Sequence, residues 1–584
     1  MDDNDHSDPT NDPLARAIAA AFGDEHRDVD PLIQPSGNPK FGDYQANVAM
    51  SLARAVGRQP RDVAQAILDH VDLDGVCERT EIAGPGFINL HPTAAFLDEQ
   101  LRAAASDDRL GVPRAASPRT VVVDYSGPNV AKEMHVGHLR SAIIGDAIVR
   151  VLDYQGHRVI RQNHLGDWGT QLGMLIAHLI DIGFDARGEH AIRDLNALYQ
   201  EAKRKDDSDA PFAARARQRV VKLQAGDEQT LALWRALIDE SKRHFNVVYR
   251  RLGLLLTDAD IRPESFYNDR LPDVVASLDA AGLLKESQGA AVVYPPGFKD
   301  RDGEPMPMIV RKTDGGYLYA TTDLAALRYR ASDLGAQRII YVTDARQAQH
   351  FAMVFAAARA AGWVDESVQL EHVAFGTVLG KDNRPFKTRE GGTVRLVDLL
   401  DEAEQRAASV VEQKAEELSA AERSQVAKVI GIAALKYADL SSDRVKDYVF
   451  DWQRMLSMDG NTAPYLINAY VRIASIFRKA GDAGAAAGVD TQAITIVEPA
   501  ERQLALRLLQ FPGVVDAVAN HLEPHRLCTY LYDTAATFHS FYEKCRVLGS
   551  DDVVQRSRLA LCRLTGDVLK RGMMLLGMDT AERM

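Results

Sequence analysis

The sequence lacks the features of a membrane protein and of a secreted, disulfide-bonded protein. No segment approaches the roughly 18 consecutive apolar residues that a membrane helix needs, and the acidic start MDDNDHSDPTND is unlike a secretory signal. The four cysteines, Cys77, Cys528, Cys545 and Cys562, lie far apart without a CxxC pair. This spacing argues against structural zinc and against a disulfide framework, and it predicts a cytoplasmic protein.

Positive charge is also in deficit, because the net charge is −13 at pH 7. Residues 1–12 carry five aspartates and no Lys or Arg, which is typical of a disordered, solvated tail. An acidic total argues against non-specific DNA packaging. It does not exclude RNA binding, since phosphate contact needs only a local basic face.

The length of 584 residues allows roughly three or four domains. Residues 13–95 combine helical periodicity with strand-like sequence around a Gly-Pro-Gly turn, which predicts an α+β unit. Residues 118–395 alternate strand and helix, interrupted by charged helical sequence at about 185–270, and predict an α/β domain with a parallel sheet and an insertion. Residues 396–450 are predicted as a helical connector and residues 451–584 as an all-α unit.

The most informative segment is VVVDYSGPNVAKEMHVGHLRS, residues 121–141. An apolar run ends in Asp124, and a loop then leads to the sequence His135-Val136-Gly137-His138 at the start of a helix. A strand, a loop and a helix N-terminus together favour phosphate, because the first helical N–H groups lack partners and the helix dipole attracts anions. Each histidine alone would be read as an ordinary helix-capping residue, but their combination with Gly137 predicts a nucleotide site.

This segment resembles the HIGH motif of class I aminoacyl-tRNA synthetases, and its flanks resemble the arginine-specific member of that class. The resemblance rests on Pro128, Asn129, Val130, Ala131, Lys132, Glu133, Met134, His135, Val136, Gly137 and His138. It implies a Rossmann-like catalytic domain in which His135, Gly137 and His138 bind ATP. It also implies that the two histidines stabilise charge on the α-phosphate, each donor contributing roughly 3 kcal/mol by analogy with oxyanion-hole groups.

The second class I motif, KMSKS, is absent. The corresponding loop, GKDNRPFKTREGGTV at 380–394, supplies Lys381, Lys387 and Arg389. Cationic side chains suit a pyrophosphate leaving group, although a basic loop can also be merely solvated. The resemblance implies that Lys381 and Lys387 act in catalysis, that Arg389 binds ATP, and that Lys132 compensates for the degraded motif. Which loop lysine dominates stays open.

Recognition of arginine calls for carboxylates, because a guanidinium pairs with a carboxylate through two parallel hydrogen bonds. The resemblance implies that Asp124, Asn129, Tyr319, Asp323 and Gln347 bind the amino acid. Without the resemblance, Tyr319 and Asp323 are only a pair four residues apart near a helix start, where Asp323 would be read as an N-cap.

The N-terminal segments NPKFGDYQANVAM and IAGPGFINL resemble the additional tRNA-binding domain of arginyl-tRNA synthetases. The C-terminal helices, from DGNTAPYLINAYVRIASIF onward, resemble their anticodon-binding domain. Tyr465 and Tyr470 either stack on unpaired anticodon bases or belong to the core of a helical bundle.

The resemblance therefore implies ligation of L-arginine to tRNA(Arg) through arginyl-adenylate, with ATP and Mg²⁺. It implies no structural zinc, no membrane association and a monomer. Two alternatives stay open: another class I ligase, such as a cysteinyl or pantothenate enzyme, and a catalytically inactive RNA-binding paralogue. This chain lacks the zinc-type cysteines expected of a cysteinyl enzyme, and its long helical C-terminal part disfavours the small ligases. The intact HVGH sequence speaks against the inactive paralogue.

Overall fold

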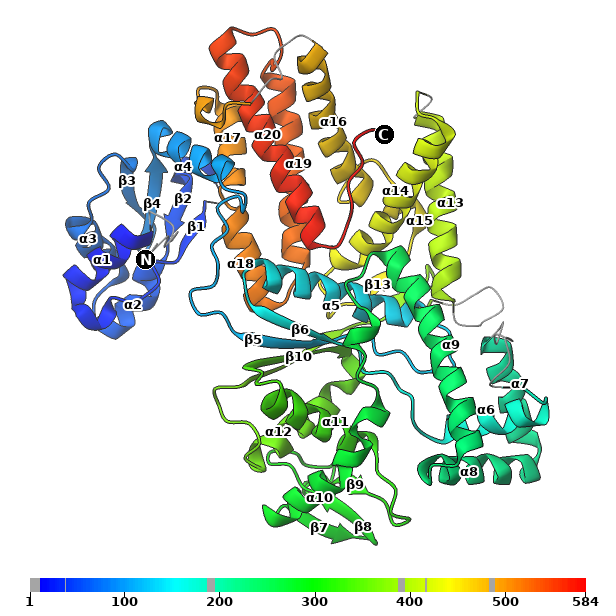
Figure 1. The fold of residues 1–584 in the computed structure, drawn as a ribbon. Helices are drawn as coiled ribbons and strands as arrows, with labels where there is room; N and C mark the ends of the chain where they lie inside the picture. Colours follow the sequence, from blue (N-terminus) through cyan, green and yellow to red (C-terminus); the bar gives the residue numbers. More distant parts are fainter. Residues whose placement is uncertain (1–10, 37, 186–194, 387–393, 415–416, 483–488) are drawn as a thin grey trace.

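The computed structural model describes residues 11–36, 38–185, 195–386, 394–414, 417–482 and 489–584 (Figure 1). It has an α+β N-terminal part, a parallel sheet with helices, and a helical C-terminal part, so the predicted fold class is confirmed. Most of the expected acidic tail, together with Lys387 and Arg389, lies outside the described residues. No described helix is long and apolar enough to cross a membrane.

The N-terminal part is a four-stranded antiparallel sheet covered by helices. Its elements are α1 (Asn11–Phe22), β1 (Ile33–Pro35), β2 (Tyr44–Ala46), α2 (Val48–Val56), α3 (Pro60–His70), β3 (Cys77–Ala83) and β4 (Phe87–Pro92), and the strand order is β1-β2-β4-β3. Helix α1 begins at Asn11, so the last two residues of the expected tail are helical. Gly84 and Gly86 have positive φ, and they make the predicted turn between β3 and β4.

The central sheet is entirely parallel, in the order β11-β10-β5-β6. It contains β5 (Thr120–Asp124), β6 (Arg158–Gln162), β10 (Arg338–Asp344) and β11 (Gln369–Phe375), with α5 (Val136–Tyr154) and α12 (Ala348–Ala360) as crossover helices. In β5, Val121 and Val123 pack into the core that α5 shares, whereas Val122 packs with Phe351 of α12. Because both faces are covered, the two central strands, β5 and β10, are continuous apolar runs rather than alternating ones.

The connection between β6 and β10 adds no strand to this sheet and spans residues 163–337. It contains α6 (Thr170–Asp181), α7 (Leu195–Ser208), α8 (Ala210–Gln224), α9 (Glu228–Leu252), η4 (Glu264–Arg270), α10 (Leu271–Ala280), β7 (Leu284–Ser287), β8 (Ala290–Val293), β9 (Met308–Arg311), α11 (Tyr319–Arg328) and η5 (Tyr329–Asp333). The interruption is thus longer than the expected insertion at about 185–270. The three short strands form their own antiparallel sheet, which the sequence pattern alone did not separate from the parallel one.

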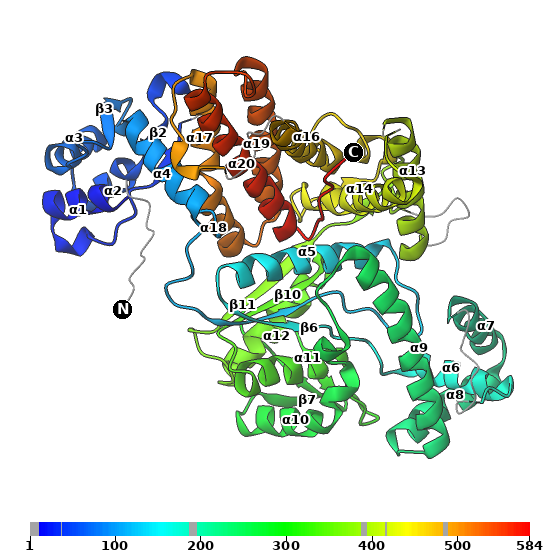
Figure 2. The same cartoon turned by 45° about the horizontal axis from the view of Figure 1, so that its top comes forward.

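Beyond the central sheet, the described elements are helices apart from two two-residue strands. The elements are β12 (Val378–Leu379), α13 (Leu396–Lys414), α14 (Ala420–Leu440), β13 (Tyr448–Val449), α15 (Trp452–Met455), α16 (Ala463–Asp482), η7 (Thr491–Ala493), α17 (Pro499–Leu508), α18 (Phe511–His521), α19 (His525–Lys544) and α20 (Asp552–Leu575). Strand β13 pairs with β12, so the region expected as a purely helical connector also contributes a strand. Figure 2 shows α5 between the sheet and these helices.

The buried Arg140 of α5 fixes this contact. Its Nε donates to both oxygens of Asp439 on α14, at 3.0 and 3.2 Å. The helix whose N-terminus carries the HVGH sequence is therefore anchored directly to the helical part.

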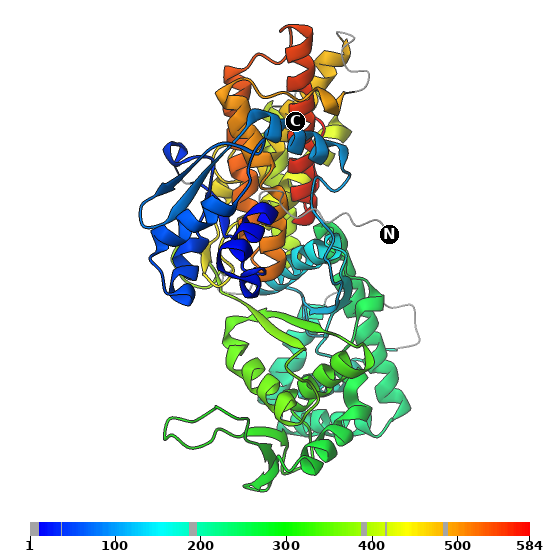
Figure 3. The ribbon, with the colours of Figure 1, turned by 90° about the vertical axis from the view of Figure 1, so that its left-hand side faces the viewer.

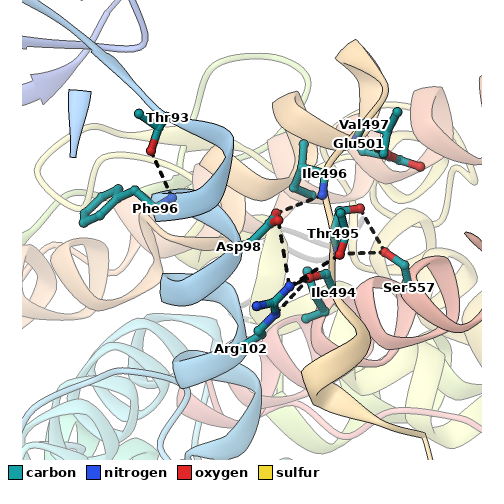
Figure 4. Close-up of polar contacts among 10 residues, drawn as sticks. All are labelled: Thr93, Phe96, Asp98, Arg102, Ile494, Thr495, Ile496, Val497, Glu501 and Ser557. Atoms are coloured by element: carbon teal, nitrogen blue, oxygen red, sulfur yellow. Dashed lines mark hydrogen bonds and ion pairs between the residues drawn. The ribbon is translucent and has the colours of Figure 1, made fainter. Parts of the chain in front are cut away.

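Helix α4 (Ala94–Ser106) follows the N-terminal sheet and packs on the C-terminal helices (Figures 3 and 4). In this contact, Asp98 accepts the backbone N–H of Ile496 at 2.8 Å, and Arg102 donates to the carbonyl of Ile494 at 2.6 and 2.9 Å. The N-terminal part is thereby held against the bundle, next to η7, by buried and half-buried polar contacts.

Candidate active site

The HVGH sequence forms the N-terminus of α5, as predicted. His135 is the N-cap residue, and its Nδ1 accepts the Gly137 N–H at 3.1 Å. The Nδ1 of His138 accepts the His135 N–H at 3.0 Å, and the two ring centres lie 3.9 Å apart. A Cβ atom at Gly137 would lie 2.9 Å from the His135 ring, so only glycine leaves this ring in place.

These hydrogen bonds determine the protonation of both rings. Because each Nδ1 accepts a backbone N–H, a neutral ring carries its proton on Nε2. Burial, followed by the charges of His135 and Lys132, lowers the pKa of His138 to about 3, and burial together with Lys132 lowers the pKa of His135. Both rings are therefore neutral Nε2–H donors at neutral pH, and such donors can bind phosphate oxygens.

The loop before the motif is strained and is held by α9. Ser126 and Ala131 have positive φ values of 74° and 60°, which non-glycine residues seldom adopt. The Ala131 N–H donates to Ser241 Oγ at 2.9 Å, and the Ser126 hydroxyl lies 2.8 Å from Tyr249 OH. The insertion thus fixes the backbone conformation that presents Asn129 and Lys132.

Next to Asn129, the loop passes closely against the end of β6. The Val130 N–H donates to Gly166 O at 2.9 Å, and a Cβ at Gly166 would lie 2.1 Å from Asn129 Oδ1. Gly166 is therefore required for the position of the Asn129 amide at the carboxyl edge of the sheet.

The chain that leaves the cationic loop returns to the HVGH motif. The Val136 N–H donates to Val394 O at 3.2 Å, and the Leu396 N–H donates to Met134 O at 2.8 Å. At the other end of the loop, Lys381 pairs with Asp451 at 3.1 Å. The end of the loop after residue 393 therefore adjoins the predicted phosphate site, whereas Lys381 is engaged elsewhere in this structure.

Lys132, predicted to compensate for the missing KMSKS motif, faces the insertion. Its Nζ lies 5.1 Å from the centre of the Tyr199 ring on α7, at the distance of a cation–π contact. Its charge also lowers the pKa of both His135 and His138, so it lies electrostatically close to the motif.

The two acids predicted to bind arginine lie in different surroundings. Asp124, at the end of β5, accepts from the buried Arg330 at 2.8 Å. Asp323 lies in the second turn of α11, where Leu318 is the N-cap, so the reading of Asp323 as an N-cap is wrong. Its Oδ2 pairs with His350 Nε2 at 2.6 Å, and this bond raises the pKa of His350.

Tyr319 and Gln347 are both accessible to a ligand. Tyr319 is 69% exposed at the first turn of α11, one turn before Asp323 and on the same face. Gln347 ends the short 3-10 helix η6 (Ala345–Gln347) that follows β10, and it is also exposed. Strand ends and α11 thus bring the predicted arginine-binding residues to one edge of the sheet.

Glu264 is an acid at this site that the sequence reading missed. Its carboxylate accepts the Trp168 N–H at 3.2 Å, and no described cation forms an ion pair with it. Burial raises its pKa to about 8, with further contributions from the charges of Asp167 and Asp323. Burial, followed by the charge of Glu264, raises the pKa of Tyr319. It begins η4 after Arg262-Pro263, within sequence that reads as insertion, so no local pattern identifies it.

The two candidate anticodon tyrosines on α16 differ. Tyr465 packs against the rings of Tyr532 and His539, with centres 5.4 and 5.1 Å away, as a bundle residue does. Tyr470 borders a cavity of about 470 Å³, which is also lined by Phe477 and Arg563. Both tyrosines are half-buried, and the Tyr470 hydroxyl donates to Glu582 Oε1 at 2.9 Å.

Three parts of the chain match models of known protein families. Residues 100–452 match the family model described as tRNA synthetases class I (R), catalytic domain. Residues 466–584 match the DALR anticodon binding domain, and residues 10–91 match the arginyl tRNA synthetase N terminal domain. The arginine–tRNA ligase of Cellvibrio japonicus is 53% identical over 95% of this chain and 96% of its own, and that of Nostoc sp. is 51% identical over 98% of each. The chain belongs to the arginyl-tRNA synthetase family.

Solved members of the arginyl-tRNA synthetase family share the whole fold. The Plasmodium falciparum synthetase superposes with a TM-score of 0.84 at 31% identity and covers 98% of both chains. The Thermus thermophilus synthetase gives 0.80 at 26% identity over 98% of this chain and 99% of its own. The alternative of another class I ligase is therefore wrong. Within the described residues, no group of three or more His, Cys, Asp or Glu side chains is placed to hold a metal ion.

Proposed function

We propose that this protein ligates L-arginine to its cognate tRNA in two steps, using ATP and releasing AMP and pyrophosphate. The observation that carries the proposal is the HVGH turn of an arginyl-tRNA synthetase fold, in which two neutral imidazoles present Nε2–H groups beside the carboxyl edge of the sheet. Acids for a guanidinium, Asp323 and Glu264, lie along the same edge.

In the first step, the carboxylate of arginine attacks the α-phosphorus of ATP, the bond to the β-phosphate oxygen breaks, and pyrophosphate leaves with the electron pair. We propose that His135 and His138 donate from Nε2 to phosphate oxygens as charge develops on them. Lys132, Lys381, Lys387 and Arg389 are proposed to neutralise the leaving group, and Mg²⁺ enters with ATP as part of the substrate. The chemistry then needs only positioning and charge neutralisation.

In the second step, the 2′-hydroxyl of the terminal ribose of the tRNA attacks the activated carbonyl, its proton is lost, and AMP leaves. We propose that Asp124, Asn129 and Gln347 hold the amino-acid backbone groups, while Tyr319 and Asp323 hold the guanidinium. Tyr470, beside the cavity on the bundle, is proposed to stack on an anticodon base.

We also propose that the enzyme is a cytoplasmic monomer. Its four cysteines are free, and Cys528, Cys545 and Cys562 are buried thiols, which suits a reducing compartment. The monomeric state is proposed from the resemblance to the family.

Pyrophosphate exchange with each amino acid, in the presence and absence of total tRNA, tests the proposed reaction. Among the amino acids, we expect only arginine to support exchange. We expect this exchange to be stronger when tRNA is present. Exchange driven by a different amino acid would contradict the proposal, and the absence of exchange with any amino acid would point to the inactive paralogue.

The activation of arginine should depend on pH through Glu264. Below pH 8 the Glu264 carboxyl is largely protonated, because its pKa is about 8. A bound guanidinium favours the carboxylate form, so binding of arginine at these pH values releases a proton from Glu264. We therefore expect kcat/KM for arginine to rise from pH 6.5 to 8 and then to level. His350, whose pKa is raised by Asp323, also loses its proton as the pH rises, and this loss frees Asp323 to bind arginine. The contribution of Glu264 is therefore measured by comparing the wild type with Glu264→Gln. This variant should show a flatter profile; a profile as steep as that of the wild type would remove Glu264 from the site.

A further inference from the structure

We infer that Arg330 is a positioning residue for the amino-acid site, fastening the helix that carries Tyr319 and Asp323 to the strand that carries Asp124. This inference rests on the proposed function, because it concerns how the proposed arginine pocket is assembled. Arg330 lies outside the motifs, and its guanidinium is fully buried, with 0% exposure.

The contacts of Arg330 join three separate elements. Its Nη2 donates to Asp124 Oδ2 at 2.8 Å on β5, and its Nε donates to Gln162 Oε1 at 2.7 Å at the end of β6. Its Cζ lies 4.8 Å from the centre of the Tyr341 ring on β10. The carboxyl-terminal ends of β5 and β6 and the middle of β10 are therefore gathered around one guanidinium.

The backbone that carries Arg330 is unusual. Arg330 lies in the π-helical turn η5, which continues α11 without a break, seven residues after Asp323. A π-turn adds a residue to the helical turn and rotates the side chains that follow, and such turns are frequent at functional sites. In this way one continuous helix presents Tyr319 and Asp323 at one end and inserts Arg330 into the sheet at the other.

This pairing changes what Asp124 can offer to a substrate. Its charge is already balanced by Arg330, and its Oδ2 already accepts a hydrogen bond from that guanidinium. Because a buried carboxylate deprived of its partner is costly, removing Arg330 would disturb both the charge and the orientation of Asp124. Asp124 therefore serves as a hydrogen-bond acceptor of fixed orientation, and the acids proposed for the substrate guanidinium are Asp323, which pairs only with a histidine among the described residues, and Glu264.

A second buried arginine on the same sheet provides a matched control. Arg338, at the first residue of β10, is 2% exposed and pairs with Glu371 on β11 at 2.5 and 3.0 Å. It lies at the opposite edge of the sheet from the carboxyl ends. A substitution there breaks a comparable buried pair without touching the proposed site.

The test compares Arg330→Lys with Arg338→Lys in tRNA-dependent pyrophosphate exchange. We expect Arg330→Lys to raise the KM for arginine by about tenfold to a hundredfold, as for a misplaced binding group, while the KM for ATP changes by less than about twofold. Arg338→Lys should leave both constants close to those of the wild type. Equal effects of the two variants, or equal changes in the two substrate constants, would overturn the inference.

A double-mutant cycle separates positioning from general stability. If Arg330 acts through Asp124, then Arg330→Lys should add little in an Asp124→Asn background, whereas independent roles would give additive effects. If Arg330→Lys does not fold, Gln162→Leu decides, because it removes only the second acceptor and should raise the KM for arginine in the same direction; an unchanged KM would overturn the inference. Failure of the wild type to activate arginine would instead contradict the proposed function.

Discussion

Replacing His138 by alanine should lower kcat for pyrophosphate exchange by about a hundredfold to a thousandfold, the range found when one preorganised donor to a developing oxyanion is removed. The neutral Nε2–H of His138 is available because its Nδ1 is already occupied by the His135 N–H at 3.0 Å. The same hydrogen bond caps α5, so alanine also removes a structural contact worth about 1 kcal/mol.

His138→Asn and His138→Gln separate these two roles. Asparagine places an oxygen near the position of Nδ1 and can keep the cap, but it has no donor at the position of Nε2. Glutamine places an amide near Nε2 and can keep the donor. We therefore expect His138→Asn to be stable and nearly inactive, and His138→Gln to be more active although less well capped. The rate of pyrophosphate exchange measures the activity of each variant, and thermal unfolding measures the loss of the cap. The reverse order of activities would contradict the assignment.

The sequence was most informative where the chemistry is local. The HVGH turn is contiguous, and its strand, loop, glycine and helix start each leave a recognisable pattern, so its place at a helix N-terminus after a strand could be predicted without a structure. The sheet was predictable for a related reason: Val121 to Val123 and Ile339 to Val342 are buried on both faces and read as continuous apolar runs.

The rest of the site depends on contacts between residues that are remote in sequence. Asp124 and Arg330 are 206 residues apart, and the π-turn that inserts Arg330 has no sequence signature. Glu264 has an elevated pKa only because the fold buries it beside Asp167 and Asp323. The contact of Lys132 with Tyr199 likewise depends on how the insertion folds back. Candidate site residues could therefore be predicted from the sequence, but the residues that they contact in the fold could not.

Replacing Asp323 by alanine should raise the KM for arginine by about 30-fold to 3000-fold, because losing one partner of a buried, hydrogen-bonded charge pair costs about 2–5 kcal/mol. Asp323 is mostly buried, lies on the same helical face as Tyr319, and pairs with His350 at 2.6 Å. The contact with His350 uses Oδ2 of Asp323, so Oδ1 can still accept from the guanidinium of the substrate.

The KM for ATP should stay within about twofold in Asp323→Ala, because the HVGH turn belongs to a different element and shares no hydrogen bond with α11. Asp333→Ala is the matched control: this acid ends the helical segment that continues α11, and it forms a half-exposed ion pair with Arg270 at 2.8 Å. Such surface pairs contribute about 0–1 kcal/mol, so this variant should keep normal arginine kinetics. If Asp323→Ala were as active as Asp333→Ala, guanidinium recognition would have to be reassigned, with Glu264 as the remaining uncompensated acid at the pocket.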